Sequence, residues 1–584
     1  MSASPLYEST ELPSLIDQLL AEQQSIAPVE NFARRHDEGV LSPELKVYEE
    51  RFRIDHSELR PGQQLAFQVD LDACTGCKAC VTACHSMNGL APEETWREVG
   101  LVLGEGGSQQ TVTTACHHCE DPACLAGCPV KAYEKDPVTG IVRHLDDQCI
   151  GCQYCVLKCP YDVPKYSAEL KIVRKCDMCT GRLAAEESPA CVQGCPTGAI
   201  SITIVDLSES DRPTELLSGL GQTIPDSAIT RPTTRYVSKR SSNSALASTL
   251  TSTLTSTPTS APLRPADIDR VRPRSAHDPL AVMLVLLQLS VGALGIGLAA
   301  SFLEIISGSA FCFVLILAAS TAVLGLGAAT MHLGRPLYAF RAFLGWRTSW
   351  MSREIIVIGA YVPGVAMAAA ASAVVQFGSA LELDSNSVSY VLVRLASDWQ
   401  VVLQAVALFT GAIGIVCSMM IYIDTRRAAW SFLRTGPLFL GTLLALGAFG
   451  VAAAIVLAAT FAGEGTSFAA IPFLVLGLVA LGAKLRFESA LRAPTKDGAS
   501  ESNALANGAR LMRGPLRVRS HVRLAFAAIG ALGAVASIAS IALGGPSFVI
   551  TLLIGALLLS CTFGEFVERH LYFTAEASPS MPGH

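Results

Sequence analysis

Four groups of four cysteines between Cys74 and Cys195 limit the fold more than any other feature of this 584-residue sequence. A [4Fe–4S] cube needs four thiolates from one compact shell, and each group supplies that number. We therefore expect all of these cysteines to be metal ligands. The groups are Cys74, Cys77, Cys80 and Cys84; Cys116, Cys119, Cys124 and Cys128; Cys149, Cys152, Cys155 and Cys159; and Cys176, Cys179, Cys191 and Cys195.

The spacing within each group is typical of ferredoxin-type cluster binding. A C-x2-C-x2-C turn wraps three sulfurs around one cube, and the fourth cysteine, usually followed by proline, binds the other cluster of a two-cluster unit. Pro129, Pro160 and Pro196 follow the fourth cysteine of the last three groups, whereas His85 occupies that position in the first. Insertions lengthen the second and fourth groups without removing a ligand.

Zinc binding and disulfide bonds are the alternative uses of so many cysteines. Zinc ribbons pair two CxxC turns across a longer loop, and disulfide frameworks belong to small exported domains. Neither class repeats a three-plus-one pattern four times. The remaining cysteines, Cys312, Cys417 and Cys561, lie singly in apolar runs, where we expect them to pack in the interior.

The composition requires more than one kind of domain, because a chain of this length with 50% hydrophobic residues is too apolar for one soluble fold. We expect an N-terminal arm at 1–59, a four-cluster domain at 60–237, a Ser/Thr-rich linker at 238–264 and a membrane anchor at 265–584.

The predicted fold class is an α+β ferredoxin-like multi-cluster domain followed by an all-α membrane bundle of about eight transmembrane helices. Short apolar or alternating segments at 139–145 and 199–205 predict small strands beside the cluster loops. A helix of about 20 residues crosses a bilayer, and the apolar runs lack the polar stripe of a water-soluble helix. These runs are roughly 279–303, 307–330, 355–377, 401–423, 437–462, 468–483, 524–543 and 548–567.

Basic residues indicate the orientation of the anchor. The loops on the linker side carry many of them, including nine from Lys484 to Arg523, whereas the opposite loops carry Arg394 alone. The positive-inside rule therefore predicts an inner-membrane protein with its cluster domain in the cytoplasm. The N-terminal residues show no secretory signal, and HDEG follows the Arg34-Arg35 pair where a twin-arginine signal needs an apolar stretch. Export by a partner's signal is the alternative.

The motifs DACTGCKACVTACH, ACHHCEDPAC, DDQCIGCQYCVLKCPYDVPKY, RKCDMC and ITRPTTRYV resemble the four-cluster ferredoxin subunit of dimethyl sulfoxide reductase-type molybdoenzymes. MHLGRPLYAFRAF and TSWMSREI resemble the eight-helix anchor subunit of the same family. The chain therefore looks like a fusion of two subunits that are separate elsewhere. The sulfite:quinone dehydrogenases are one branch of this family.

The resemblance implies that the cysteine groups exchange their fourth members. Four crossed sets result, which we call quartets I to IV. Quartet I is Cys74, Cys77, Cys80 and Cys195; quartet II is Cys116, Cys119, Cys124 and Cys159; quartet III is Cys128, Cys149, Cys152 and Cys155; and quartet IV is Cys84, Cys176, Cys179 and Cys191. Each would hold one [4Fe–4S] cluster, and no residue of this chain is expected to be catalytic. Lys131, Lys158, Arg174 and Lys175 either raise cluster potentials or lie on a solvated surface.

The resemblance also points to His332 and Glu354 as quinone-binding residues, with Arg335 and Arg341 beside them. Quinone chemistry needs two electrons and two protons, which an imidazole and a carboxylate near the last cluster serve. The alternatives are an interfacial histidine, an acid stabilised by the helix dipole, and ordinary positive-inside arginines. Haem b would need facing histidine pairs inside the spans, so we expect none.

We therefore predict an electron-transfer and membrane-anchor subunit that links quinone to a separate molybdopterin-containing catalytic subunit. The cytoplasmic orientation favours sulfite oxidation; reduction of nitrate, an S-oxide or a sulfur oxyanion is the alternative. A redox-coupled ion-translocating protein is a competing hypothesis, which we weight less because the spans look nearly free of ionisable residues. No G-x-G-x-x-G or P-loop motif indicates a stand-alone dehydrogenase, and no nucleic-acid partner is expected.

Overall fold

The computed structural model describes most of the cluster domain and of the membrane anchor. The described residues are 14–26, 59–103, 109–207, 225–238, 264–266, 271–378, 388–463, 468–492, 500–578 and 581. The predicted linker and most of the predicted arm lie outside them. The chain divides into a smaller unit, residues 1–57 and 180–189, and a larger unit, residues 58–179 and 190–584.

The smaller unit contains two described helices, α1 (Leu15–Ile26) and α7 (Thr180–Ala184). A reciprocal pair of hydrogen bonds caps α1: the Ser14 backbone N–H donates to the Asp17 carboxylate at 3.1 Å, and the Asp17 N–H donates to the Ser14 hydroxyl at 3.1 Å. Part of the predicted arm is therefore a helix whose N-terminus is capped by its own residues.

The cluster domain of the larger unit is built from short strands and short helices, which confirms the predicted α+β class. Its strands are β1 (Gln63–Asp70), β2 (Glu98–Leu103), β3 (Gln109–Thr114), β4 (Tyr133–Lys135), β5 (Val142–His144), β6 (Lys165–Ser167), β7 (Ile172–Arg174), β8 (Ile200–Asp206), β9 (Arg235–Val237) and β10 (Arg264–Pro265). Its helices are α4 (Ala79–Asn88), α5 (Ala123–Gly127), α6 (Tyr154–Lys158) and α8 (Ala190–Gln193), with the 3₁₀ turn η4 (Ser227–Ile229). The sheets have the orders β8-β1-β9, β10-β2-β3, β4-β5 and β6-β7.

The strand pairing explains how distant cysteines approach each other. Strand β1 ends shortly before Cys74, and its antiparallel partner β8 begins shortly after Cys195, with Val69 opposite Ile200. This pairing brings the two cysteines to the same end of the sheet. The hairpins β4-β5 and β6-β7 join the second cysteine group to the third and the third to the fourth.

Eight described helices are long and apolar enough to cross a membrane, as predicted. The anchor contains α11 (Asp278–Phe302), α12 (Gly308–His332), η5 (Pro336–Gly345), α13 (Trp350–Gly378), α14 (Val388–Ile423), η6 (Ala428–Trp430), α15 (Phe432–Ala462), η7 (Phe468–Ala470), α16 (Ile471–Arg492), α17 (Ser500–Arg513), α18 (Arg517–Ala542) and α19 (Ser547–Thr574). Several of these helices extend beyond the predicted apolar runs. The sixth, at 468–483 in the sequence, continues to Arg492, because a helix does not end at its first charged residue.

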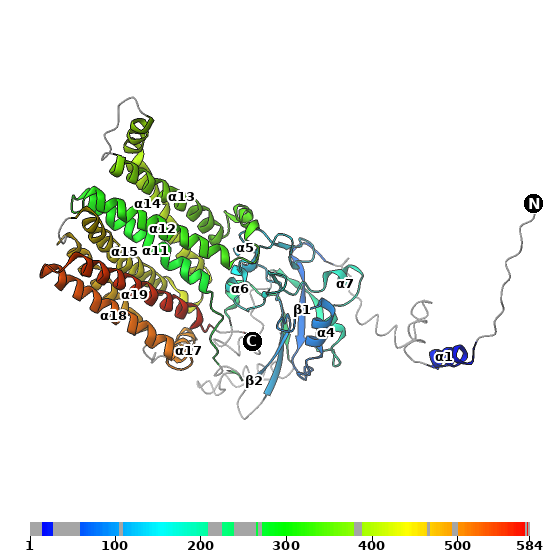
Figure 1. Ribbon diagram of the computed structural model, residues 1–584. Helices are drawn as coiled ribbons and strands as arrows, with labels where there is room; N and C mark the ends of the chain where they lie inside the picture. Colours follow the sequence, from blue (N-terminus) through cyan, green and yellow to red (C-terminus); the bar gives the residue numbers. More distant parts are fainter. Residues whose placement is uncertain are drawn as a thin grey trace, which may run out of the picture. The chain divides into compact units, whose positions relative to one another are not determined.

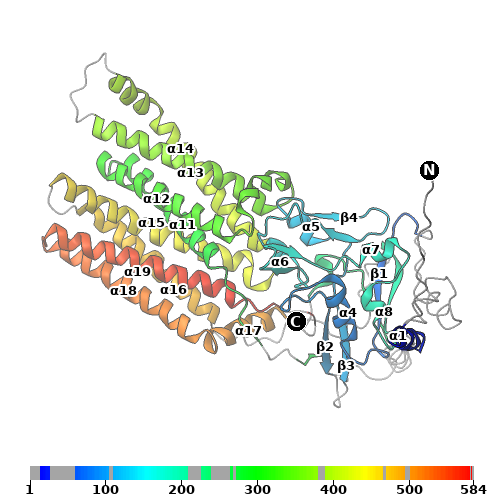
Figure 2. The same cartoon turned by 45° about the vertical axis from the view of Figure 1, so that its right-hand side comes forward.

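Helices α11 and α15 lie at the centre of the bundle and are the most buried of the eight spans. In each, 78% of the most apolar stretch is buried. They pack against each other, and the other spans surround them (Figures 1 and 2). The two helices cross at Gly292 and Gly447: a Cβ built on Gly447 would lie 2.5 Å from the Gly292 carbonyl carbon. Close backbone approach at small residues is a usual way for membrane helices to associate.

Candidate cluster-binding and quinone sites

All four cysteine groups share one backbone feature, a left-handed residue directly before the second cysteine. The residues are Gly76, His118, Gly151 and Met178, with φ of 72°, 40°, 67° and 61°. Glycine adopts this conformation without strain, whereas histidine and methionine reach it at a cost of order 1 kcal/mol. The repeated turn directs the chain around a common centre in each group, which is what a cube requires.

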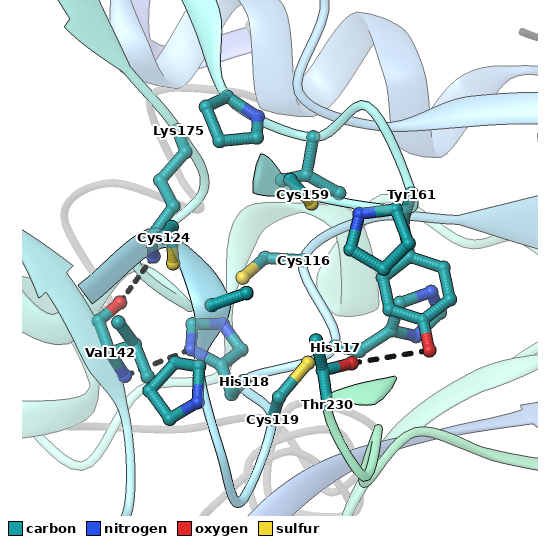
Figure 3. A pocket seen from close by; sticks show the side chains of 15 residues that line it. Cys116, His117, His118, Cys119, Cys124, Val142, Cys159, Tyr161, Lys175 and Thr230 are labelled. Carbon is teal, nitrogen blue, oxygen red and sulfur yellow. Dashed lines mark hydrogen bonds between the residues drawn. The ribbon is translucent and has the colours of Figure 1, made fainter. Parts of the chain in front are cut away.

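The cysteines of quartet II line one cavity, which Figure 3 shows with their sulfur atoms facing the same space. Cys159 belongs to the third sequence group, so this cavity joins residues of two groups. The cysteines of quartet I line a second cavity, in which Cys195 faces the first group. Both arrangements have the membership that the family resemblance implied.

Helix packing brings the cysteines of the other two quartets together. The pKa shifts that these thiols cause in one another show that they are neighbours. Helix α4 packs against α8, and α5 packs against α6. Burial, followed by the neighbouring Cys191 and Cys179 thiols, raises the pKa of Cys84 to about 12. Burial, with a smaller contribution from Cys149, raises the pKa of Cys128 to about 11. Such thiols ionise only beside a positive charge, which iron supplies, so the donor set fits iron–sulfur clusters.

Backbone N–H groups point at several of these sulfur atoms, as in cluster-binding loops. The N–H···S contacts recur at equivalent places in the repeated motif: Ala132 to Cys128 and Ala199 to Cys195, both at 3.2 Å, and Gly151 to Cys149 and Met178 to Cys176, both at 3.4 Å. Donors to thiolate stabilise negative charge, and they are one way in which a protein raises a cluster's potential.

The four basic residues near the cysteines have different environments. Lys131 is exposed, Lys158 forms an ion pair with Asp424 of the anchor at 2.6 Å, and Arg174 forms one with Glu94 at 2.5 Å. Lys175 is buried, so a solvated surface position is wrong for this residue.

His332 and Glu354 both lie at the ends of spans that meet the cluster domain. The His332 imidazole Nε2 lies 3.3 Å from the carbonyl oxygen of Cys152 in quartet III. Glu354 is fully buried in α13, one turn inside the helix, and its carboxylate accepts a hydrogen bond from the Ser418 hydroxyl of α14. Their roles toward quinone stay predictions.

Arg335 and Arg341 contact the cluster domain through backbone carbonyls. Arg335 donates to the carbonyl of Asp146 at 2.9 Å, and Arg341 donates to that of Asp147 at 2.6 Å. These contacts favour the docking alternative for both arginines, while quinone binding by them stays a prediction.

Main-chain atoms form much of the same contact. The Arg335 N–H donates to the Ile150 carbonyl at 3.0 Å, and the Gly345 N–H donates to the Pro129 carbonyl at 2.8 Å. A Cβ on Gly345 would lie 2.6 Å from that Pro129 oxygen, so only glycine fits without a shift.

A set of buried and half-buried charges, which we call the docking network, joins the cluster domain to the anchor and the C-terminal segment. It consists of Asp162, Arg274, Arg427 and Glu576. Arg274 binds both carboxylate oxygens of Asp162, at 3.0 and 2.9 Å, and Arg427 bridges Asp162 and Glu576 at 3.1 and 2.8 Å. Arg427 also donates to the carbonyl of Cys159 at 3.2 Å. Burial alone would raise the pKa of Asp162, but the two guanidiniums hold it well below its usual range.

Sequence reasoning missed His277, which precedes α11. Its ring lies perpendicular to that of His332, with centroids 5.1 Å apart. Burial, followed by the proximity of His332, lowers the pKa of His277 to about 4, so the ring is neutral at pH 7. It lines a cavity of about 320 Å³ with Trp430 and Phe573. A histidine directly before an apolar run was the available signal.

Sequence reasoning was also wrong that the spans are nearly free of ionisable residues. Helices α16, α18 and α19 contain a buried ion network of six residues: Lys484, Glu488, Arg523, Glu565, Glu568 and Arg569. Lys484 pairs with Glu565 and, at 3.1 Å, with Glu568. Arg523 donates to Glu488 at 2.8 Å and to Glu565 at 2.7 Å. Lys484 and Arg523 are therefore helix residues with internal partners, not loop charges.

Comparison with known proteins supports the iron–sulfur assignment. The 4Fe-4S dicluster domain family matches residues 108–205, so this part of the chain is an iron–sulfur electron-transfer domain. The B subunit of anaerobic dimethyl sulfoxide reductase from Haemophilus influenzae is 35% identical over 156 residues, 25% of this chain and 76% of that protein. The corresponding Escherichia coli subunit is 38% identical over 154 residues, 24% of this chain and 75% of that protein.

The chain belongs to the family of iron–sulfur subunits that includes the B subunit of dimethyl sulfoxide reductase. The formate dehydrogenase-O iron-sulfur subunit of Escherichia coli is also similar, at 34% identity over 24% of this chain and 52% of that protein. In the described part of the chain, eight helices that are long and apolar enough to cross a membrane follow the iron–sulfur domain and indicate a multi-pass membrane protein.

Proposed function

We propose that this chain is the electron-transfer and membrane-anchor subunit of a molybdoenzyme complex. Its quartets I to IV would hold four [4Fe–4S] clusters, which supply one-electron carriers when bound. The observation that carries this proposal is the cavity of quartet II, in which Cys159 of one group completes the ligand set of another. The family membership supports a separate catalytic subunit, which we propose to be the molybdopterin-containing one.

Quartet III is the set that we place at the membrane end of the electron path. The carbonyl of Cys152 contacts His332, and the Tyr154 hydroxyl, two residues further, donates to the Ile421 carbonyl of α14 at 3.2 Å. These contacts support short electron transfer between the anchor and quartet III.

His332 and Glu354 are our proposed quinone-binding pair. The imidazole would hydrogen-bond a quinone oxygen, and the carboxylate would take or give a proton beside the Ser418 hydroxyl. Buried, ionisable residues inside a span are expensive and usually functional, which supports this role for Glu354. We further propose, from the basic loops, a cytoplasmic cluster domain at the inner membrane, with sulfite as the favoured substrate of the catalytic partner.

The cluster content and the partner are tested on the purified full complex. Iron and acid-labile sulfide, together with EPR spin counting after reduction, should correspond to four clusters per chain. Clearly fewer clusters would reject this proposal. A purified complex without molybdenum cofactor would reject the proposed partner.

The quinone site is tested with His332→Ala and Glu354→Gln in the complex. We expect both to lose most quinol-linked turnover, while turnover with a dye that reacts directly with the clusters stays near wild type. His521→Ala and Glu304→Gln are matched controls, because both residues are exposed. Unchanged quinol-linked turnover in both test variants would show that the site lies elsewhere.

A second candidate function, redox-coupled ion translocation, is favoured by the buried ion network alone. Two of its carboxylates, Glu488 and Glu568, line a cavity of about 90 Å³ beside α17. Charged chains of this kind form proton relays in pumps. Proteoliposomes with entrapped pH dye distinguish the two functions: translocation requires more protons per electron than quinone chemistry releases, and Glu568→Gln should remove the excess. No excess in wild type would reject translocation.

A further inference from the structure

Two cations are buried among the cysteines, and neither forms an ion pair with a carboxylate of the described residues. Arg97 and Lys175 are each 2% exposed. The Arg97 guanidinium donates through Nη1 to the Thr113 hydroxyl at 3.3 Å and lies 4.6 Å from the Phe67 ring centroid, while its Nη2 has no partner in the described part of the chain. A buried charge without a partner is strongly unfavourable, so an anion must lie beside it.

Lys175 shows the same pattern. Its ammonium group donates to two backbone carbonyls, those of Val142 and, at 2.9 Å, Cys176. The preceding residue, Arg174, has a carboxylate partner in Glu94. Two adjacent basic side chains therefore differ in kind: Arg174 forms an ion pair with a carboxylate, and Lys175 donates to backbone carbonyls.

The surroundings of Arg97 identify its anion. Thr113 contacts both the guanidinium and, at 3.7 Å, the Cys80 sulfur of quartet I. Burial alone would lower the pKa of Arg97, but the neighbouring Cys191 and Cys80 sulfurs, followed by those of Cys176 and Cys84, hold it above its ordinary value. Three of these cysteines belong to quartet IV, so Arg97 lies between quartets I and IV.

Lys175 lies at the next junction. It lines the quartet II cavity in Figure 3. Its hydrogen bond to the Cys176 carbonyl, at 2.9 Å, also places it beside quartet IV. Quartet IV therefore lies beside both cations.

We propose that Arg97 and Lys175 are fixed counter-charges of the clusters, and that together they give the quartet IV site the highest reduction potential in the chain. This inference rests on the proposed crossed quartets. One electron added at that site adds one negative charge, and no bond forms or breaks and no proton moves. Two buried cations favour that extra charge more than one does. Neither residue is a cluster ligand, so each would act through its charge, by stabilising the added electron.

The test is a potentiometric EPR titration of the full complex, with dithionite as reductant, for variants that remove or keep each charge. Arg97→Gln and Lys175→Gln should each shift the signal of highest potential to more negative values, and the double variant should shift it further. Arg97→Lys and Lys175→Arg should restore most of the wild-type potential. Arg143→Gln is the matched control, because Arg143 is exposed and paired with Glu134.

Three results decide the proposal. Potentials that stay at wild-type values in Arg97→Gln and Lys175→Gln, with full iron content, would overturn it. So would an Arg97→Lys shift as large as that of Arg97→Gln, because the effect would then depend on shape and not on charge. If the Gln variants lose iron, the Lys and Arg variants decide: retained clusters and potentials support the counter-charge role, and equal losses refute it. The iron content of wild type tests the proposed number of clusters separately.

Discussion

Removing the charge of Asp162 should loosen the cluster domain from the anchor. In Asp162→Asn the side chain keeps one oxygen, but Arg274 and Arg427 then share Glu576 as their only carboxylate in the docking network. Breaking a buried ion pair from one side costs about 3–5 kcal/mol. The Asp162 side chain is 16% exposed, so solvent screening favours the lower end of that range.

A cost of about 3 kcal/mol corresponds to roughly 100-fold more frequent local opening of the contact. Hydrogen–deuterium exchange of the full complex, followed by mass spectrometry, measures this opening directly. Peptides covering 154–163 and 421–430 should exchange about 100-fold faster in the variant, while peptides of α11 and α15 stay unchanged.

Asp206→Asn is the matched control, because it makes the same chemical change at an exposed residue. Exchange at the contact that differs from this control by less than about threefold would refute the reasoning, since the network would then contribute under about 1 kcal/mol.

Two further predictions concern pH and helix packing. The pKa of Asp162 is lower in the folded protein than in the unfolded chain, so its stabilising effect is complete above the ordinary aspartate pKa and is lost as the pH falls through the folded-state pKa. The frequency of local opening, corrected for intrinsic exchange, should therefore be constant between pH 5 and 8. A steep change in that window would contradict the ion-pair assignment. Gly447→Val should cost about 1–3 kcal/mol by forcing α11 and α15 apart. Its thermal unfolding in detergent should begin several degrees lower than that of Gly327→Val, which has no atom within 4 Å of the added Cβ; equal midpoints would show that the crossing tolerates bulk.

The features that sequence reasoning captured are those that a local pattern determines. The CxxC spacings and the eight apolar runs depend on neighbours within a few turns, and the fold class followed from them. The buried ion network was not captured, because the average hydropathy of a span stays high when a single charged residue lies near the end of its apolar run. Lys484 and Arg523 are two such residues, in different helices. Lys484 and Arg523 looked like loop charges, and only the packing of α16, α18 and α19 shows that carboxylates neutralise both.

Arg97 was missed for a related reason. It lies outside every cysteine motif, and strand pairing of β2 with β3 brings it beside Thr113 and the Cys80 sulfur. Lys175 was noticed because it adjoins Cys176, but its burial depends on contacts with residues far along the chain. The sequence around these two residues does not show that the environment of Lys175 differs from that of Arg174.

The main-chain contacts around Gly345 bear on how a fused chain and a pair of separate subunits relate to each other. Amide and carbonyl groups are present whatever the side chain, so the seam from Arg335 to Gly345 does not depend on matched residue pairs across it. Within this segment, a side chain on one face can therefore be replaced without a matched change on the other, provided that glycine is retained where the backbones meet. A covalent tether would add local concentration to such a seam without redesigning it, and gene fusion or fission would leave its geometry intact.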